Sequence, residues 1–424
     1  MKNFFDKIFI RSNNLDYISQ NIKHLSKNVS VKKIFDTINS FSPESEIRYV
    51  GGCIRKIINK EEIDDIDFAT NLEPKEVCDA LNENNISFYE TGIDHGTIIA
   101  VIDKFKFEIT TLREDTQTDG RHAKVKFSKD WKEDALRRDF TINSIYSDKD
   151  GNLFDPFNGK KDLENGLINF IGDADTRIKE DYLRILRYLR FFSNYSKHPH
   201  NKDDLRKLKI NIGGVSKLSK ERLMDELKKI MKLETLEKLV KDKSSLDLTL
   251  MIFPELKNID IFSKLNSNLR NLLKEVDFVF LLSLMIIDGS DNTEYFLYKF
   301  NISKKDQKRI KIIDNFYKEK VSKKIFSENN MNRIFYYEGK QAVNDILNFY
   351  IIKSKKFDDG LVELNKQYQK KTIPRMPIAA NLLINKYQIS RGKQLGSKLK
   401  MIEEQWVNNN FKISDQQVEN IIND

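Results

Sequence analysis

Hydrophobic and polar positions along the chain follow two different periods, and the change comes near residue 172. Between residues 46 and 172, short runs rich in β-branched and aromatic residues alternate with stretches of helical spacing. Residues 98–102 and 105–111 are predicted strands, and residues 74–82 are a predicted helix. This alternation indicates a head in which strands and helices are mixed.

Residues 1–45 and 173–424 show the period of helices instead. The N-terminal segment is expected to end at Ser42-Pro43, because proline disfavours a helical residue before it. Beyond residue 172 the helical period continues, with predicted helices at residues 178–192 and 220–231. Residues 278–287 are apolar enough for a buried helix but too few to cross a membrane. The pattern therefore predicts helices on both sides of the head.

Composition narrows the class of protein. The 424 residues are 39% hydrophobic, which is enough for more than one core. The 73 basic residues exceed the 64 acidic ones by nine, and this favours a polyanionic partner such as nucleic acid. Two cysteines cannot support a disulfide framework or a zinc site. Charges interrupt the apolar residues at the start of the chain, so we expect a cytoplasmic protein with no membrane partner. No protein partner can be inferred.

A pair of glycines, Gly51 and Gly52, follows a predicted strand and precedes a predicted helix. Without side chains they let the backbone approach phosphate groups, and the N–H groups at the start of a helix attract anions. Arg55 can face the same phosphates across the first helical turn. A glycine pair alone is a plain turn in most proteins, so this interpretation depends on the residues that follow.

The acidic residues Asp65 and Asp67 predict a metal site. If they lie on a strand, their spacing points both carboxylates to one face. Two such carboxylates suit Mg²⁺, which completes its shell with water and substrate phosphates. Two cations need further oxygen ligands, and Glu108, in the predicted strand at 105–111, is the candidate for a third carboxylate. The alternatives are a solvated aspartate pair and an outward-facing glutamate.

Two other charged pairs indicate nucleotide chemistry. Arg138 can clamp a triphosphate bidentately, and the adjacent Asp139 can accept hydrogen bonds from ribose hydroxyls. Asp181 and Arg184 lie one turn apart on the predicted helix at 178–192, where a fixed carboxylate and guanidinium can imitate the hydrogen-bonding edge of a base. A surface salt-bridge cluster at the first pair and an i, i+3 ion pair at the second are the alternatives.

In their order, these motifs resemble the class II tRNA nucleotidyltransferases, the CCA-adding enzymes, which share a head with bacterial poly(A) polymerases. A weaker similarity continues from Ser219 to Leu227. The resemblance is carried by Val50-Gly51-Gly52-x-x-Arg55, Asp65-Ile66-Asp67, His95-Gly96-Thr97, Glu108 to Arg113, Arg137 to Asn143, Asp155 to Gly159, and Glu180-Asp181-x-x-Arg184.

The resemblance implies an α+β fold with a polymerase-β-type nucleotidyltransferase head at residues 46–172. Residues 1–45 would be a helical extension. Residues 173–235 would form a helical neck that carries the nucleobase-recognition helix. Residues 236–424 would form an all-α body and tail that bind tRNA.

Roles for individual residues also follow from the resemblance. Asp65, Asp67 and Glu108 would be the catalytic carboxylates, with Asp65 and Asp67 holding Mg²⁺ in a two-metal site. Asp181 and Arg184 would act as the protein template for C and A. The residues expected to bind the nucleotide are Gly51, Gly52, Arg55, Arg138, Asp139, Asp181, Arg184, Arg187 and Arg190.

The implied activity is addition of C, C and A to the 3′ end of tRNA from CTP and ATP, without a nucleic-acid template and with release of pyrophosphate. The alternatives are a poly(A) polymerase or an A-adding relative on the same head, and a non-catalytic RNA-binding paralogue. One residue departs from the family pattern, because Lys56 stands where an aspartate is usual. At the start of a helix, lysine would be disfavoured by the macrodipole by well under about 1 kcal/mol.

Overall fold

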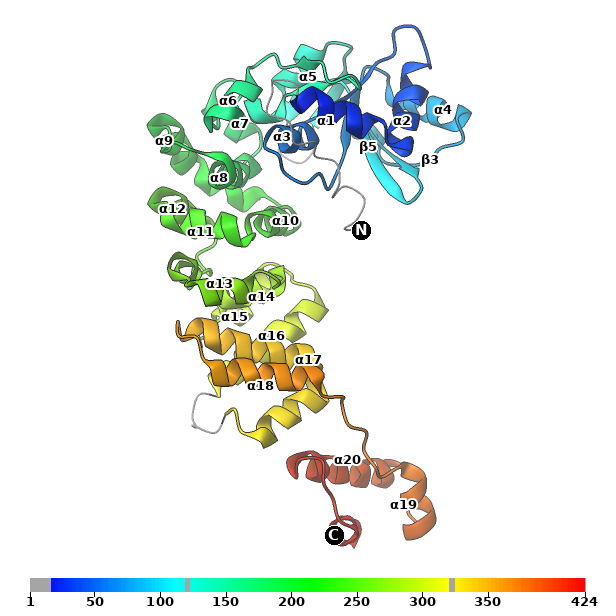
Figure 1. Ribbon diagram of the computed structural model, residues 1–424, viewed down its shortest axis with the longest axis vertical. Helices are drawn as coiled ribbons and strands as arrows, with labels where there is room; N and C mark the ends of the chain where they lie inside the picture. The colour runs from blue at the N-terminus through cyan, green and yellow to red at the C-terminus, as the bar shows by residue number, and fades with distance from the viewer. Residues whose placement is uncertain (1–16, 119–122, 320–324, 424) are drawn as a thin grey trace. The chain divides into compact units, whose positions relative to one another are not determined.

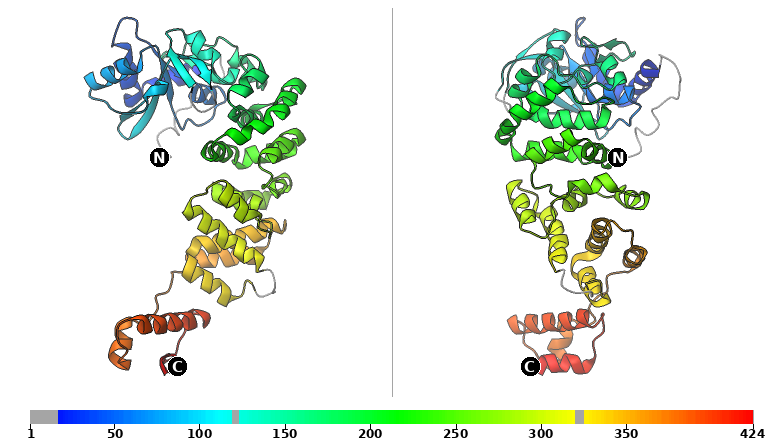
Figure 2. Two further views of the ribbon diagram at one scale, coloured as in Figure 1. Left: turned by 180° about the vertical axis from the view of Figure 1, so that it is seen from behind. Right: turned by 90° about the vertical axis from the view of Figure 1, so that its left-hand side faces the viewer.

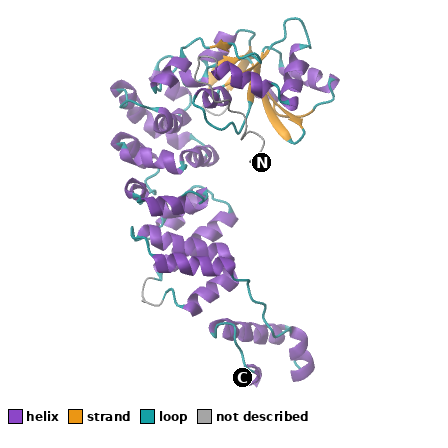
Figure 3. Ribbon diagram, in the orientation of Figure 1, coloured by secondary structure: helices purple, strands orange, loops and turns teal. Residues whose placement is uncertain are grey.

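A computed structural model describes residues 17–118, 123–319 and 325–423 (Figure 1). Helices predominate among these residues, and the strands are confined to the N-terminal part (Figure 3). The chain forms two compact units. The first extends to Ile230 and includes Asp242–Ile252, and the second comprises Met231–Lys241 and the residues from Phe253 onward.

The head is built on a seven-stranded sheet with the order β3-β4-β5-β2-β1-β8-β9. Strand β2 pairs with β5 in parallel, whereas the other neighbouring strands of this sheet run antiparallel. The predicted strands at 98–102 and 105–111 are confirmed as β4 and β5. The strands are β1 (Ile47–Val50), β2 (Asp67–Thr70), β3 (Ser87–Gly92), β4 (Thr97–Ile102), β5 (Phe105–Thr111), β8 (Tyr146–Ser147) and β9 (Leu153–Phe154), and a separate ribbon contains β6 (Arg113–Thr118) and β7 (Ala123–Phe127).

Helices that precede and interrupt the sheet form its main core. Residues 1–16 of the predicted N-terminal extension lie outside the described residues, and the rest of it forms α1 (Tyr17–Ser26) and α2 (Val29–Asn39). The predicted helix at 74–82 is confirmed as α4 (Pro74–Glu83). Alternate side chains of the sheet pack against these helices, as Tyr49 and Phe68 do with Phe35. Neighbouring positions such as Ala69 face the opposite side of the sheet.

The remaining helices of the first unit lie either between strands, as α3, η1, α5 and η2 do, or after the last strand, β9. Here η denotes a 3₁₀ helix. These helices are α3 (Gly52–Ile58), η1 (Ile93–His95), α5 (Trp131–Leu136), η2 (Thr141–Asn143), α6 (Gly159–Asn165), α7 (Ala174–Glu180), α8 (Leu183–Tyr195), α9 (Lys202–Asn211), η3 (Ile212–Lys217), α10 (Lys220–Ile230) and α12 (Lys243–Ile252).

One predicted helix is in fact two. The expected helix at 178–192 is broken, because α7 ends at Glu180 and α8 begins at Leu183. Asp181 between them has an extended backbone, with φ −150° and ψ 104°. Its carboxylate accepts a hydrogen bond from the backbone N–H of Leu183 at 3.1 Å, which satisfies a free donor at the start of α8. The prediction of a continuous helix is therefore wrong, whereas the helix predicted at 220–231 is confirmed as α10.

The described part of the second unit is helical (Figure 2). Helix α14 is buried from Phe280 to its end at Ile286, as expected for most of residues 278–287. Across the described ranges, none of the helices combines the length and apolar character needed to cross a membrane. The elements are α11 (Leu233–Lys241), η4 (Ile259–Lys264), α13 (Ser267–Leu273), α14 (Phe278–Ile286), α15 (Asn292–Lys299), α16 (Lys304–Lys318), α17 (Glu328–Lys353), α18 (Asp359–Lys370), α19 (Ala380–Tyr387), α20 (Lys393–Asn408) and α21 (Asp415–Asn423).

Candidate active site

Asp67 and Glu108 lie side by side on the neighbouring parallel strands β2 and β5. They are register partners, and neighbouring strands are about 4.8 Å apart. Phe68, Phe107 and Ile109 belong to the helix-covered core on one face of the sheet. Because strand side chains alternate, Asp67 and Glu108 are on the other face. Strand pairing thus brings together two of the predicted carboxylates that are far apart in the sequence.

Asp65 precedes strand β2, which begins at Asp67. The condition that both aspartates lie on a strand is therefore not met, although their charges still interact. Burial, followed by the charges of Asp65 and Glu108, raises the pKa of Asp67 to about 7. Burial and the charge of Asp65 also raise the pKa of Glu108. Three carboxylates that repel one another form a place where a cation is favoured.

The oxygen atoms of these carboxylates suit Mg²⁺ better than a metal ion whose ligands all come from the protein. Within the described ranges, no group of three or more His, Cys, Asp and Glu side chains is gathered closely enough to hold a metal by itself. Mg²⁺ is commonly bound through one or two carboxylates and takes its other oxygens from water and substrate phosphates. An all-oxygen, open arrangement meets that requirement.

The predicted glycine turn lies between an aspartate and an arginine of this site. Gly51 has φ +69°, a conformation that favours glycine, and it immediately precedes α3. A Cβ atom on Gly51 would be 3.7 Å from Arg138 Nη1. A Cβ atom on Gly52 would be 3.9 Å from Asp65 Oδ1. The bare backbone of the turn is therefore next to both charged groups.

Arg138 is held by Asp134 and Tyr146, to which the sequence analysis gave no role. Its Nη2 is 3.1 Å from Asp134 Oδ2, and its Nε donates to the Tyr146 hydroxyl at 2.9 Å. Asp134 is 1% exposed. Burial raises its pKa, but the charges of Arg137 and Arg138 outweigh this and hold the pKa well below its usual range. The i, i+4 spacing of Asp134 and Arg138 on a predicted helix could have revealed this pair.

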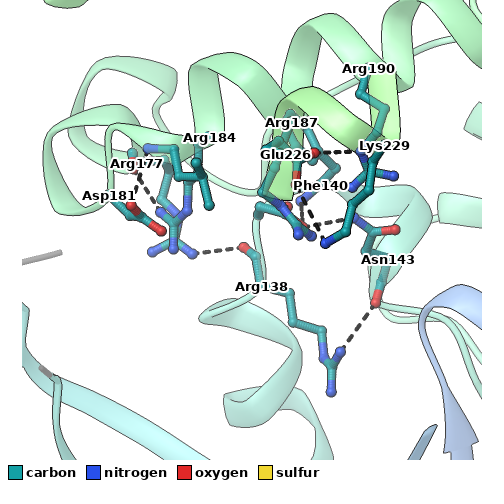
Figure 4. A network of polar contacts seen from close by, with 12 residues as sticks. Arg138, Phe140, Asn143, Arg177, Asp181, Arg184, Arg187, Arg190, Glu226 and Lys229 are labelled. Atoms are coloured by element: carbon teal, nitrogen blue, oxygen red, sulfur yellow. Dashed lines mark hydrogen bonds and ion pairs between the residues drawn. The ribbon is translucent and has the colours of Figure 1, made fainter. Parts of the chain in front are cut away.

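Asp139 belongs to a chain of polar contacts with Asn143 and Arg187, the two partners that Figure 4 labels. One carboxylate oxygen accepts a hydrogen bond from Asn143 Nδ2 at 2.8 Å, and the other accepts from Arg187 Nε. The Asn143 side-chain oxygen accepts from Arg55 Nη1. Burial raises the pKa of Asp139, but the charge of Arg187 and the hydrogen bonds from Arg187 and Asn143 lower it by more. The pKa of Asp139 is therefore well below its usual range. The chain links the glycine-turn helix to helix α8.

Three of the predicted nucleotide-binding arginines converge on the ring of Phe191. The guanidinium carbons of Arg55, Arg187 and Arg190 lie 4.7, 5.5 and 4.1 Å from its centroid. Burial, with repulsion from Arg187 and Arg55, lowers the pKa of Arg190 despite its ion pair with Glu226. This concentration of positive charge suits a polyanionic ligand.

Asp181 and Arg184 do not pair with each other, so the alternative of an i, i+3 ion pair is wrong. Asp181 Oδ2 lies 2.7 Å from Arg222 Nη2. Arg184 Nη1 lies 2.7 Å from Glu180 Oε2 and donates to the carbonyl oxygen of Arg177, also at 2.7 Å. Asp181 lies at the break between α7 and α8, and Arg184 lies in the first turn of α8 (Figure 4).

Lys56 lies in the last turn of α3, where the helix dipole favours a positive charge. The expectation that Lys56 starts a helix and is disfavoured by the dipole is therefore wrong. Its ammonium group contacts Asp64 and lies 3.4 Å from Asp65 Oδ1. Lys56 also lowers the pKa of Asp67. It offsets part of the negative charge of the carboxylates.

Comparisons with known proteins agree over nearly the whole chain. Residues 47–169 match the family described as Poly A polymerase head domain. The human protein named CCA tRNA nucleotidyltransferase 1, mitochondrial, is 33% identical over 390 residues, which cover 87% of this chain and 84% of the relative. The CCA-adding enzyme of Staphylococcus haemolyticus is 30% identical over 347 residues, covering 80% of this chain and 82% of the relative.

Solved structures show the same fold. The Bacillus stearothermophilus CCA-adding enzyme in complex with CTP matches with a TM-score of 0.67 and 19% identity, over 92% of this chain and 95% of that one. The Thermotoga maritima CCA-adding enzyme complexed with tRNA matches with a TM-score of 0.60 and 18% identity, over 96% of this chain and 98% of that one. The predicted α+β class, with a sheet-containing head and a helical remainder, is confirmed.

Proposed function

The chain belongs to the family of CCA-adding enzymes, the tRNA nucleotidyltransferases, and we propose that it adds C, C and A to the 3′ end of tRNA. CTP and ATP are the substrates, pyrophosphate is released, and no nucleic-acid template is used. The observation that carries the proposal is the pairing of Asp67 with Glu108, together with a glycine turn that lies next to Asp65 and Arg138. Oxygen ligands for a cation and a bare backbone for phosphates are the two requirements of nucleotidyl transfer.

Asp65 and Asp67 would hold Mg²⁺, with Glu108 as the third carboxylate. When bound, Mg²⁺ lowers the pKa of the attacking ribose hydroxyl and neutralises the triphosphate. The hydroxyl at the 3′ end of the tRNA attacks the α-phosphate in line, and pyrophosphate leaves.

The basic residues around the turn would bind the triphosphate. Arg138 is supported for this role because Asp134 and Tyr146 fix its guanidinium next to Gly51. The three arginines around Phe191 add further positive charge to the site. Such fixed donors stabilise a transferring phosphoryl group without reorganising during the reaction.

Asp181 and Arg184 would select the base. A carboxylate accepts from the exocyclic amine that C and A both carry, and a guanidinium donates to ring nitrogens or carbonyl oxygens. Asp139 would position the ribose, which is supported by its ionised, buried carboxylate next to Asn143.

We propose that the helical segments after the head serve as neck, body and tail. Residues 173–235 would carry the base-recognition residues, and residues 236–424 would bind tRNA. The net charge of +9 supports contact with a polyanion. Phosphate contacts would make tRNA binding weaken steeply with salt. The expected cytoplasmic location stays a prediction from the sequence.

The activity is tested with three truncated tRNAs, which lack CCA, CA or only the final A. Purified protein receives Mg²⁺ and either CTP or ATP. CTP should extend the first two substrates and stop, and ATP should extend the third by one nucleotide. Runs of A on all three would indicate a poly(A) polymerase, and extension of the third alone would indicate an A-adding relative. Binding of tRNA without extension of any substrate would indicate a non-catalytic RNA-binding protein.

The metal assignment is tested separately. Asp65→Ala and Asp67→Ala should abolish incorporation while tRNA binding survives, because the carboxylates hold the cation and not the RNA. Asp64→Ala is the matched control, since the neighbouring Asp64 side chain is 67% exposed and contacts Lys56. It should retain incorporation within about threefold, as expected for an exposed ion pair. Normal incorporation by both of the first two variants would contradict the assignment.

A further inference from the structure

The carboxylate of Asp181 is held from two sides. Its Oδ1 accepts from the backbone N–H of Leu183 at 3.1 Å, and its Oδ2 lies 2.7 Å from Arg222 Nη2. The side chains of Asp181 and Arg222 are 24% and 31% exposed. The pair is therefore ordered and yet accessible to a ligand.

The backbone on each side of this pair is also anchored. Arg222 lies in the first turn of α10, where its N–H donates to Ser219 Oγ at 3.3 Å. Tyr182, which follows Asp181, lies so close to Gly214 of η3 that a Cβ atom there would be 2.0 Å from the Tyr182 ring. The break between α7 and α8 is thus packed against two other elements, and Asp181 has little freedom to move.

Arg184 is engaged elsewhere. Its guanidinium contacts Glu180 and the carbonyl oxygen of Arg177. The guanidinium that contacts Asp181 is instead that of Arg222, which is contributed by a different helix and lies far from Asp181 in the sequence.

We propose that Arg222 is a positioning residue for base selection, which fixes the Asp181 carboxylate in the orientation that accepts the exocyclic amine of C or A. This inference rests on the proposed function, which assigns Asp181 to the base. A carboxylate has about four lone-pair sites, of which Leu183 and Arg222 take one each. The others remain for the amine. Uracil presents an oxygen where cytosine has this amine, and two acceptors repel each other.

The test compares nucleotide preference in Arg222 variants. Single-nucleotide incorporation is measured with CTP and UTP on tRNA lacking CCA, and with ATP on tRNA lacking the final A. Arg222→Gln should raise KM for CTP and ATP about tenfold, change kcat less, and lower the preference for CTP over UTP about tenfold. Arg222→Lys, which keeps the charge but not the planar fork, should retain part of the preference.

The matched control is Arg206→Gln on α9. Arg206 pairs with Asp203, its side chain is 64% exposed, and it lies in the same unit. Its loss should leave KM and nucleotide preference unchanged. If Arg222→Gln weakens tRNA binding and leaves nucleotide preference intact, Arg222 contacts RNA and the inference is overturned.

A double-mutant cycle shows whether Arg222 acts through Asp181. In the Asp181→Asn background, Arg222→Gln should add no further loss of preference, because its partner is already altered. Additive losses would overturn the inference. If Asp181→Asn alone leaves the preference unchanged, the proposed base assignment fails. If Asp181→Asn abolishes the preference and both Arg222 variants keep it, only the present inference fails. Arg222→Lys keeps the test decisive if Arg222→Gln does not fold.

Discussion

Binding of Mg²⁺ should depend steeply on pH because of Asp67. Its pKa is raised to about 7 by burial and by the charges of Asp65 and Glu108. Protons and the cation compete for the same carboxylate. About a tenth of the Asp67 side chains are ionised at pH 6, about half at pH 7 and about nine-tenths at pH 8. The apparent affinity for Mg²⁺ should therefore fall about tenfold from pH 8 to pH 6.

The same shift determines how the stability of the protein changes with pH. The ordinary pKa of Asp67 is 3.8, and folding raises it to about 7. The folded state therefore binds the proton more tightly, and the stabilisation is fully present below pH 3.8 and is lost as the pH rises through about 7. About three pKa units correspond to at most about 4 kcal/mol, and partial exposure reduces this. When a chelator removes Mg²⁺, the free energy of unfolding of the Asp67→Asn variant should fall less with rising pH than that of the natural protein.

Isothermal titration with Mg²⁺ at pH 6, 7 and 8, in two buffers of different ionisation enthalpy, measures affinity and proton release together. About half a proton per Asp67 should be released at pH 7, and about a tenth at pH 8. Asp64→Ala should behave like the natural protein, and Asp67→Asn should lose the proton release. Equal affinity at pH 6 and pH 8 without proton release would refute this account of Asp67 as a ligand of raised pKa.

Three further predictions concern the surroundings of the carboxylates. Gly51→Ala should destabilise the protein by about 1–3 kcal/mol, measured by thermal unfolding, because φ is +69° there. The cost is not larger, since the added Cβ atom would meet no atom closer than 3.7 Å. Asp134→Ala should cost about 3–5 kcal/mol and reduce incorporation, because it leaves the buried Arg138 without its counter-charge; Asp134→Asn should cost less. Lys56→Ala should move the midpoint of the pH profile of incorporation upward, because Lys56 lowers the pKa of Asp67, and an unchanged midpoint would contradict this.

Local patterns were sufficient to predict much of the head and its chemistry. The strands β4 and β5 were recognisable because their β-branched and aromatic residues have the period of strands, and α4 was recognisable from its helical spacing. The glycine turn was predictable because Gly51 needs a conformation that other residues rarely adopt. These features depend on residues that are neighbours in the sequence.

Predictions failed where contacts distant in the sequence determine local structure. The break at Asp181 was missed because the hydrophobic period continues on both sides of it, whereas Tyr182 at the break packs on Gly214, a residue distant in the sequence. The partner of Asp181 was also missed, because Arg222 belongs to another helix. Lys56 was misplaced because the length of α3 was unknown.

The sequence by itself determined which residue types could do the chemistry and on which kinds of element most of them lie, because composition and periodicity are local properties. Only the tertiary structure decided which charges meet. The parallel register of β2 and β5 places Glu108 beside Asp67, and the packing of α10 against α8 brings Arg222 to Asp181. Strand register and helix packing arise from the burial of whole hydrophobic faces, so no single motif reveals them.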